Sequence, residues 1–336
     1  MITASGVANV FRPLTRSTAV VFMMHRFRGP DHRAVCHEPA TVRALLEYLR
    51  RAGHQLIDLP TLFASLRGEG PPLRHAVAFT IDDGYSEHAS VAAPLFAEFD
   101  CPVTTFVTTG FLDGGLWFWW DQIQFVLTHS ERRNVTLSLG DRQLRYDLAN
   151  DRPDARQAAA DDFTTRCKSL TEDARADAIA RLATAAEVDI PARPTPAFAP
   201  MTWADVRRCE RGGMSFGPHT VTHPFLGRVS DARARDEISK SWQRLQAETR
   251  SPVPVFAYPN GQPGDFGQRE FRLLAESGLV GAVTGVEGFV TRERFQTTDG
   301  AYLIPRFPLP SSLPYLIQQV DGLERFKAIL RGDDAR

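Results

Sequence analysis

Short apolar runs alternate with helical patterns along most of the chain. Runs rich in β-branched residues predict strands at 17–24, 75–81, 103–107, 214–216, 255–258, 280–284 and 302–306. Apolar residues spaced three or four apart predict helices at 41–52, 91–99 and 231–249, and a further helix that begins at Thr202. Strands that alternate with helices usually pair in parallel, so the pattern predicts an α/β layer fold.

The pattern changes between about residues 113 and 200. An aromatic cluster is followed by a hairpin signal at Gly140-Asp141, by helices rich in Ala, Arg and Asp, and by a proline-rich stretch at 191–200. We interpret this segment as a helical insertion in a single catalytic domain that spans residues 1–336. Two uses of the insertion stay open, a cap beside the active site and an independent packing subdomain.

The composition is that of an ordinary globular protein. With 336 residues, 43% hydrophobic and 24% charged, the chain can bury a sizeable core without disulfides or structural metals. A net charge of −1 at pH 7 gives no general attraction to nucleic acid or anionic lipid, so neither is expected as a partner. The apolar run at 18–24 is too short to span a membrane and lacks a signal-peptide cleavage site, so we expect a cytoplasmic protein.

The first chemical motif is Asp82-Asp83-Gly84, which directly follows the predicted strand at 75–81. Barrel folds assemble their active sites at the carboxyl ends of the strands. One acid there can bind a metal ion while its neighbour accepts a proton from water, and the glycine lets the chain turn away sharply. Taken alone, the motif is also consistent with a capped turn between a strand and a helix.

The second chemical motif places His219 and His223 four residues apart. The two imidazoles face the same side if the segment makes a helical turn, and such a pair chelates zinc and related divalent metals. Two loop histidines that meet by chance are the alternative for this motif alone. Combined with the two aspartates, the pair predicts a hydrolase site with a metal ion, a carboxylate base and a polarised amide carbonyl.

These motifs resemble those of the polysaccharide deacetylases that share the NodB homology domain. Residues 80–85 are similar to the first motif of this family and residues 219–224 to its second. Residues 101–107 resemble the stretch after the first motif, and residues 256–261 resemble the third-motif region of the exopolysaccharide branch. The resemblance covers roughly residues 20–308, and the insertion matches only loosely. It implies a distorted parallel (β/α) barrel, for which a flat doubly wound sheet is the alternative.

The resemblance also implies roles for individual residues. It makes Asp82 the catalytic base and makes Asp83, His219 and His223 the ligands of a divalent metal ion. Zinc is the expected ion, with cobalt, nickel or iron(II) as alternatives. The backbone amide of Tyr258 takes the position that helps to bind the oxyanion in the family, although a plain strand-ending turn is the alternative there.

The chain departs from the family pattern at two positions. The best-known members carry a histidine near the C-terminus that protonates the leaving amine, whereas no histidine follows His223 here. Residues 22–26 resemble the N-terminal histidine motif of members with a circularly permuted barrel, which makes His25 the candidate acid; a structural histidine is the alternative. The usual arginine of the third motif is also missing, and Arg306 either replaces it beside Asp82 or forms a surface salt bridge.

The function that these expectations support is removal of an N-acyl group, first of all N-acetyl, from an amino sugar. The expected partner is an N-acylated amino sugar or oligosaccharide, in a glycan or a glycan precursor of exopolysaccharide biosynthesis. One alternative is an amide hydrolase of the same architecture that acts on a formamide or a cyclic ureide. Another is a catalytically silent sugar-binding protein, against which the intact acid and histidine motifs argue.

Overall fold

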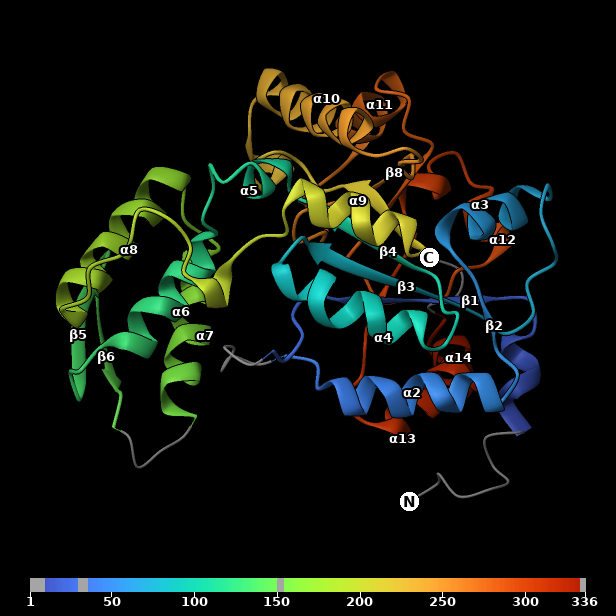
Figure 1. Ribbon diagram of the computed structural model, residues 1–336, viewed down its shortest axis with the longest axis horizontal. Coiled ribbons are helices and arrows are strands. Elements are labelled where there is room, and N and C mark those ends of the chain that lie inside the picture. The colour runs from blue at the N-terminus through green and yellow to red at the C-terminus, as the bar shows by residue number, and fades with distance from the viewer. Residues whose placement is uncertain (1–9, 30–35, 150–153, 333–336) are drawn as a thin grey trace. The chain divides into compact units, whose positions relative to one another are not determined.

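The chain folds into two compact units in the computed structural model, which describes residues 10–29, 36–149 and 154–332 (Figure 1). Within the described residues, the first unit consists of 10–29, 36–113 and 200–332. The second unit consists of 114–149 and 154–199. Both predicted chemical motifs belong to the first unit.

A parallel sheet forms the framework of the first unit (Figure 1). Its strand order is β10-β1-β3-β4-β7, and a short β2 also pairs with β3. All residues of β3 and β4 are buried, which is typical of parallel strands with both faces covered. The strands are β1 (Ala19–Met24), β2 (Gln55–Leu56), β3 (Ala76–Asp83), β4 (Val103–Val107), β7 (Met214–Pro218) and β10 (Phe307–Pro308).

Two further strands complete a ring of neighbours. β8 (Val255–Ala257) and β9 (Gly281–Val283) pair in parallel. Just before β8, the N–H of Val253 donates to Phe216 O of β7 at 2.7 Å, and Val283 forms a parallel bridge with Ile304, shortly before β10. Because β10 pairs with β1, the series of neighbouring strands closes on the first strand. The distorted parallel barrel expected from the sequence is therefore confirmed.

The interior of this ring is filled with apolar side chains. Buried residues from β1, β3, β4, β8 and β9 pack into one cluster, together with Ile304 and parts of the helix between β2 and β3. Gly217 of β7 has no room for a side chain, because a Cβ there would lie 2.6 Å from the Phe106 ring. The ring is thus a packed core, with the polar site residues confined to its carboxyl edge.

Helices cover the outside of the first unit (Figure 1). The predicted helix at Thr202 begins with a capping box between Thr202 and Asp205. The longer helices are α2 (Pro39–Arg51), α3 (Leu59–Arg67), α9 (Trp203–Arg211), α10 (Asp231–Glu248), α11 (Gln268–Glu276), α13 (Leu313–Val320) and α14 (Leu323–Arg331). The short ones are η1 (Arg12–Thr15), α4 (Ala93–Ala97), α5 (Thr109–Leu112), η4 (Leu226–Arg228), α12 (Arg292–Phe295) and η5 (Gly300–Tyr302).

Two predicted elements differ in the structure. The helix expected at 91–99 begins as a π-helical segment, η2 (His88–Ala92), before α4. The strand expected at 302–306 is wrong, since only Ile304 forms a bridge and β10 starts at Phe307. The physical reason lies in the local sequence: η5 is a tight turn at Gly300, and Pro305 has no N–H for a strand ladder.

The second unit combines a β-hairpin with three helices around a core of its own. The predicted hairpin is confirmed, with its turn at Gly140-Asp141. Trp117, from the aromatic cluster, is buried against Phe125 and Phe198. The elements are α6 (Trp119–His129), β5 (Asn134–Leu139), β6 (Arg142–Asp147), α7 (Ala155–Cys167), α8 (Glu172–Ala186) and η3 (Pro196–Phe198). A capping role of this unit over the active site stays a prediction.

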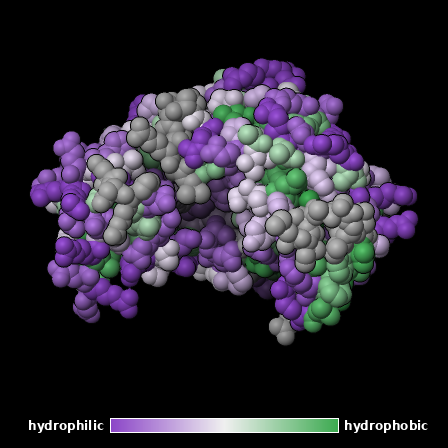
Figure 2. Space-filling view, turned by 90° about the horizontal axis from the view of Figure 1, so that it is seen from below, coloured by the Kyte–Doolittle hydropathy of each residue, from purple (hydrophilic) through white to green (hydrophobic). Residues whose placement is uncertain are grey.

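The surface is polar over most of the face seen in Figure 2, with smaller hydrophobic areas between the hydrophilic ones. Seven large apolar side chains are well exposed among the described residues, and six of them come from the N-terminal segment, α13 and α14. In the described part of the chain, no helix is both long and apolar enough to cross a membrane.

Candidate active site

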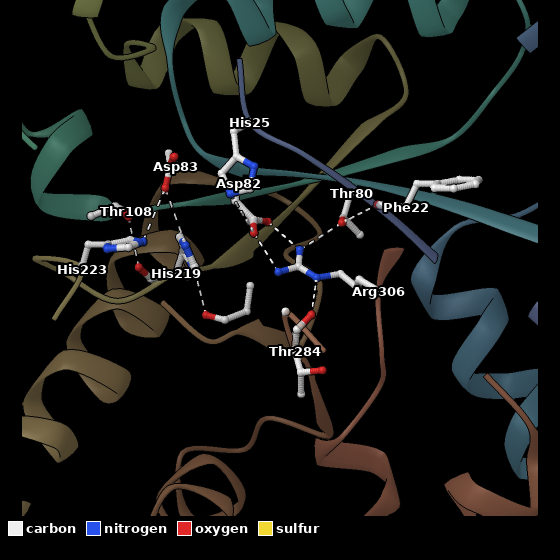
Figure 3. Close-up of polar contacts among 12 residues, drawn as sticks. Phe22, His25, Thr80, Asp82, Asp83, Thr108, His219, His223, Thr284 and Arg306 are labelled. Carbon is white, nitrogen blue, oxygen red and sulfur yellow. Dashed lines mark hydrogen bonds and ion pairs between the residues drawn. The ribbon is translucent and has the colours of Figure 1, made fainter. Parts of the chain in front are cut away.

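Three neighbouring strands deliver the predicted site residues to one edge of the barrel. The hydrogen-bond ladder continues past the ends of β3, β4 and β7, because Thr108 N donates to Asp83 O at 3.1 Å and His219 N donates to Val107 O at 3.0 Å. The carboxyl ends of the three strands are thereby held in register. The two aspartates and His219 consequently lie side by side although His219 is far from the aspartates in sequence (Figure 3).

Asp83, His219 and His223 form a compact group of possible metal ligands. One donor atom from each lies within 4.8 Å of those of the others. Asp83 Oδ1 is 3.7 Å from His219 Nε2 and 3.6 Å from His223 Nε2. Figure 3 shows the three side chains converging on one another. The donor set of two imidazoles and one carboxylate is one that zinc and related divalent ions accept.

The protonation of the two histidines fits metal binding. His219 Nδ1 lies 2.7 Å from Ala257 O, and since a carbonyl can only accept, Nδ1 carries the proton and Nε2 is left with its lone pair. Burial lowers the pKa of His219 to about 4. Burial and the neighbouring His219 lower the pKa of His223 well below its ordinary value. Both imidazoles are therefore neutral near pH 7, which is the form that binds metals.

The backbone is in the left-handed region at two of the possible ligands and at one residue of the loop between the histidines. Asp83 has φ +85°, Thr220 +66° and His223 +58°. Non-glycine residues are uncommon there, and such conformations persist where the surrounding structure enforces them, often at functional sites. Gly84 follows Asp83 at φ +97° and meets the sequence expectation of a sharp turn after the two aspartates.

Asp82 is buried and is held by Arg306 (Figure 3). The guanidinium donates from Nη1 to Oδ1 and from Nη2 to Oδ2, both at 2.8 Å. Arg306 is itself fixed, because Nε donates to Thr284 O at 2.8 Å and Nη1 also donates to the Thr80 hydroxyl at 3.0 Å. With 1% of its surface exposed, Arg306 is not part of a surface salt bridge.

The pKa of Asp82 reflects two opposing effects. Burial alone would raise it, since a charged carboxylate loses solvation in the interior. The charge of Arg306, followed by that of His219 and the hydrogen bonds from Arg306, instead holds the pKa of Asp82 well below its ordinary value. Asp82 is therefore ionised at neutral pH, the state that a proton acceptor needs.

His25 follows β1 and faces Asp82 from the side opposite Arg306 (Figure 3). Its Nε2 is 4.0 Å from Asp82 Oδ2, and about half of its side chain is exposed. The segment after the aspartate motif holds this part of the chain: His88 Nε2 donates to the His25 carbonyl, and Glu87 pairs with Arg26. The arginine also lies 3.8 Å above the Tyr85 ring.

Tyr258 is placed at the end of β8, next to the Ala257 carbonyl that holds His219. Its backbone N–H donates to Val283 O at 3.3 Å, a long bond that continues the pairing of β8 with β9. Its ring is buried and stacks on Phe266 at 4.4 Å between centroids. An oxyanion role for the amide thus requires that the bond to Val283 gives way or is shared.

Sequence reasoning missed the residues that support the site. Thr80 and Thr284 anchor Arg306, and Glu237 of α10 binds the loop between the two histidines. The signal for Glu237 was present, since it lies in the apolar stripe of α10 with Ala234, Ile238 and Ser241. An acid in such a stripe calls for a buried partner, but the sequence does not tell which one.

The site combines an ionised carboxylate with two neutral imidazoles and a second carboxylate, at the carboxyl edge of an α/β barrel. Such a set of groups can hold a divalent cation and suits hydrolysis. A model of the polysaccharide deacetylase family matches residues 178–277, which include both histidines and Tyr258. The resemblance found in the motifs is thereby confirmed. This match supports a hydrolase that acts on non-peptide carbon–nitrogen amide bonds.

Solved structures of deacetylases share the fold over nearly the whole chain. Streptococcus pyogenes deacetylase PplD in complex with acetate is 17% identical, with 91% of this chain and 99% of that one covered and a TM-score of 0.58. IcaB from Ammonifex degensii is 15% identical, with coverages of 91% and 97% and a TM-score of 0.57. The BpsB deacetylase domain from Bordetella bronchiseptica is 16% identical, with coverages of 86% and 95% and a TM-score of 0.52. Among curated proteins, no sequence matches this chain.

Proposed function

We propose that the chain is a metal-dependent hydrolase that removes an N-acetyl group from an amino sugar in a glycan or a glycan precursor of exopolysaccharide biosynthesis. The observation that carries the proposal is the pair of neighbouring carboxylates with separate partners. Asp82 is clamped by Arg306, whereas Asp83 faces His219 and His223. A base beside a cation site suits hydrolysis, whereas sugar binding alone requires neither.

Asp83, His219 and His223 would hold a divalent cation, zinc in the first place, which would supply a Lewis acid for the amide carbonyl and for water. The chain's own base is Asp82, which accepts the proton of the attacking water. Arg306 keeps this base ionised and fixes both of its oxygens. The bidentate clamp thereby also orients the carboxylate toward the water.

His25 is the proposed proton donor to the leaving amine. It faces Asp82 across 4.0 Å and is partly exposed, so it can reach both the base and a substrate at the edge of the barrel. Water adds to the carbonyl carbon, the carbon–nitrogen bond breaks, and the amine leaves with the proton from His25. The Tyr258 amide is the proposed backbone donor to the oxyanion, in exchange for its long bond to Val283.

The test is release of acetate and formate by zinc-loaded protein from N-acetyl and N-formyl amino sugars and their oligomers. We expect acetate release, and a loss of about 100-fold or more in Asp82→Asn, because a positioned base contributes roughly 10²–10⁴-fold. Asp141→Asn, at the exposed turn between β5 and β6, is the matched control and should keep full activity.

Other outcomes separate the alternatives. Release of formate alone, or turnover of a cyclic ureide, would assign the site to an amide hydrolase with another substrate. Bound zinc and bound sugar without release of any acid would favour a silent sugar-binding protein. Unchanged acetate release by Asp82→Asn would refute Asp82 as the base.

A further inference from the structure

The loop between the two histidines, residues 219–223, is held from outside by main-chain and side-chain contacts. The carbonyl of Thr220 accepts from Thr109 N at 3.1 Å, and that of Val221 accepts from Gly110 N at 2.9 Å. Gly110 approaches so closely that a Cβ there would lie 2.5 Å from Val221 O. These two hydrogen bonds satisfy the carbonyls of Thr220 and Val221. The backbone N–H groups of the loop need other partners.

Glu237 provides those partners from α10, which packs against α5 (Figure 1). Its Oε2 accepts from Val221 N and from Thr222 N, both at 2.8 Å, and its Oε1 accepts from the Thr222 hydroxyl. The side chain is 5% exposed. A buried carboxylate that accepts two adjacent backbone N–H groups makes charge-assisted hydrogen bonds, which are stronger than neutral ones.

The loop cannot keep its shape without outside support. Thr220 and His223 both have positive φ, and the Thr220 hydroxyl makes hydrogen bonds within the loop, since it accepts from His223 N at 3.0 Å and donates to His219 O. Left-handed residues persist only where neighbouring structure enforces them. Arg233 approaches Glu237 at 3.8 Å but is well exposed, so the main partners of the carboxylate are the loop atoms.

We infer that Glu237 is a positioning residue that sets the metal affinity of the site by fixing the loop that carries His219 and His223. The inference rests on the proposed function, in that the three side chains hold a divalent cation. Groups that orient ligands from outside the coordination sphere change metal affinity by about 10–100-fold when they are removed.

The experiment measures the zinc dissociation constant of the full chain by competition with a chromophoric chelator. Glu237→Met keeps the length of the side chain but removes all three contacts, and we expect zinc affinity to fall by about 10–100-fold. Glu237→Gln can still accept from both N–H groups and should restore most of the affinity, with a loss of about threefold to tenfold from the lost charge. Asp236→Met is the matched control, since Asp236 is the exposed neighbour that pairs with Lys240.

A second readout reports the geometry of the site. The visible spectrum of the cobalt-substituted protein depends on the arrangement of ligands around the ion, so it should change in Glu237→Met and stay unchanged in Asp236→Met. Equal zinc affinities of wild type and folded Glu237→Met would overturn the inference and leave the proposed function standing. An equal loss in Asp236→Met would also overturn it. If Glu237→Met does not fold, an unchanged affinity in Glu237→Asp, whose side chain is one methylene too short to keep the contacts with the loop, overturns it. A wild-type protein that binds no zinc would refute the metal site itself.

Discussion

At the scale of residues, two adjacent aspartates have been given different environments. Both oxygens of Asp82 accept from Arg306 at 2.8 Å, while Asp83 Oδ1 faces two imidazole nitrogens at 3.6 and 3.7 Å. Both side chains are buried, so the difference comes from their partners rather than from solvent. Neighbouring strands present different groups to two identical residues, which supports the proposed division into a proton acceptor and a cation ligand.

The buried pair of Asp82 and Arg306 gives a stability prediction. Arg306→Met leaves the carboxylate buried without its guanidinium, and we expect the free energy of unfolding to fall by about 3–5 kcal/mol. Arg43 forms a similar two-pronged pair with Glu98 on the surface, so Arg43→Met should cost less than about 1 kcal/mol. Urea unfolding at pH 7 measures both, and equal small losses would contradict the prediction.

The motif residues could be predicted because their chemistry is local in sequence. Asp82-Asp83 and the histidine pair are each contained within five residues, and their spacing alone favours a cation site. The bidentate clamp of Asp82 by Arg306 could only be guessed, since the partners are 224 residues apart and meet through the order of strands in the barrel. Glu237 is only 15 residues from Thr222, but the sequence does not tell which group a buried acid of α10 contacts.

At the scale of elements, the strands were predicted best where both faces are buried. The bounds of β1, β3, β4 and β7 lie no more than two residues from the predicted ones, because continuous apolar runs mark such strands. The last strand was placed too early, as η5 and Pro305 interrupt an apolar stretch that reads as a strand. The closure of the sheet into a barrel came from the family resemblance, since no local pattern distinguishes a barrel from a flat sheet.

The junction of η2 with the end of β1 gives a prediction on pH. His88 begins η2, is fully buried, and donates to the His25 carbonyl. Burial is the main cause that lowers its pKa to about 3; the charges of Arg26 and His25 act in the same direction, whereas the hydrogen bond to the His25 carbonyl and the charge of Asp82 oppose them. The unfolded chain takes up a proton below about pH 6.5 and the folded one does not, so the stability present above that pH is lost as the pH falls toward 3.

The comparison is between wild type and His88→Gln, which keeps a neutral donor near the same position at every pH. Between pH 7 and pH 5, the free energy of unfolding should fall by about 2 kcal/mol more in wild type than in the variant. The difference arises because each pH unit below 6.5 costs wild type about 1.4 kcal/mol. Urea unfolding at the two pH values measures this difference. Parallel pH profiles of the two proteins would show that His88 does not titrate on unfolding.

At the scale of the whole molecule, the two compact units have separate cores, and all predicted metal ligands belong to the first. A cation that binds only the folded site stabilises the unit that contains it. Unfolding of such a chain is not expected to be a single two-state transition, because the second unit gains nothing directly from the ion.

Zinc should therefore raise the stability of the first unit alone. At a free concentration 100 times the dissociation constant, the gain is about 2.7 kcal/mol, and calorimetry with and without chelator should show one transition moving. His223→Asn removes a ligand while tolerating the positive φ at this position, so it should abolish the shift. Asp82→Asn should retain it, because Asp82 is the proposed base and is not among the possible ligands. A shift that persists in His223→Asn would place zinc elsewhere.

The pairing of β1 with β10 has a consequence for biosynthesis. The first strand of the barrel cannot pair with β10 until residues 307–308 have left the ribosome, and Arg306 directly precedes β10. Asp82 lies 224 residues earlier, so it has no guanidinium partner in a nascent chain that stops before Arg306. Contacts of such high sequence separation slow folding. Premature termination between His223 and Arg306 would thus yield a chain with its aspartate and histidine motifs but no closed ring, so the proposed base becomes competent only after Arg306 has been made.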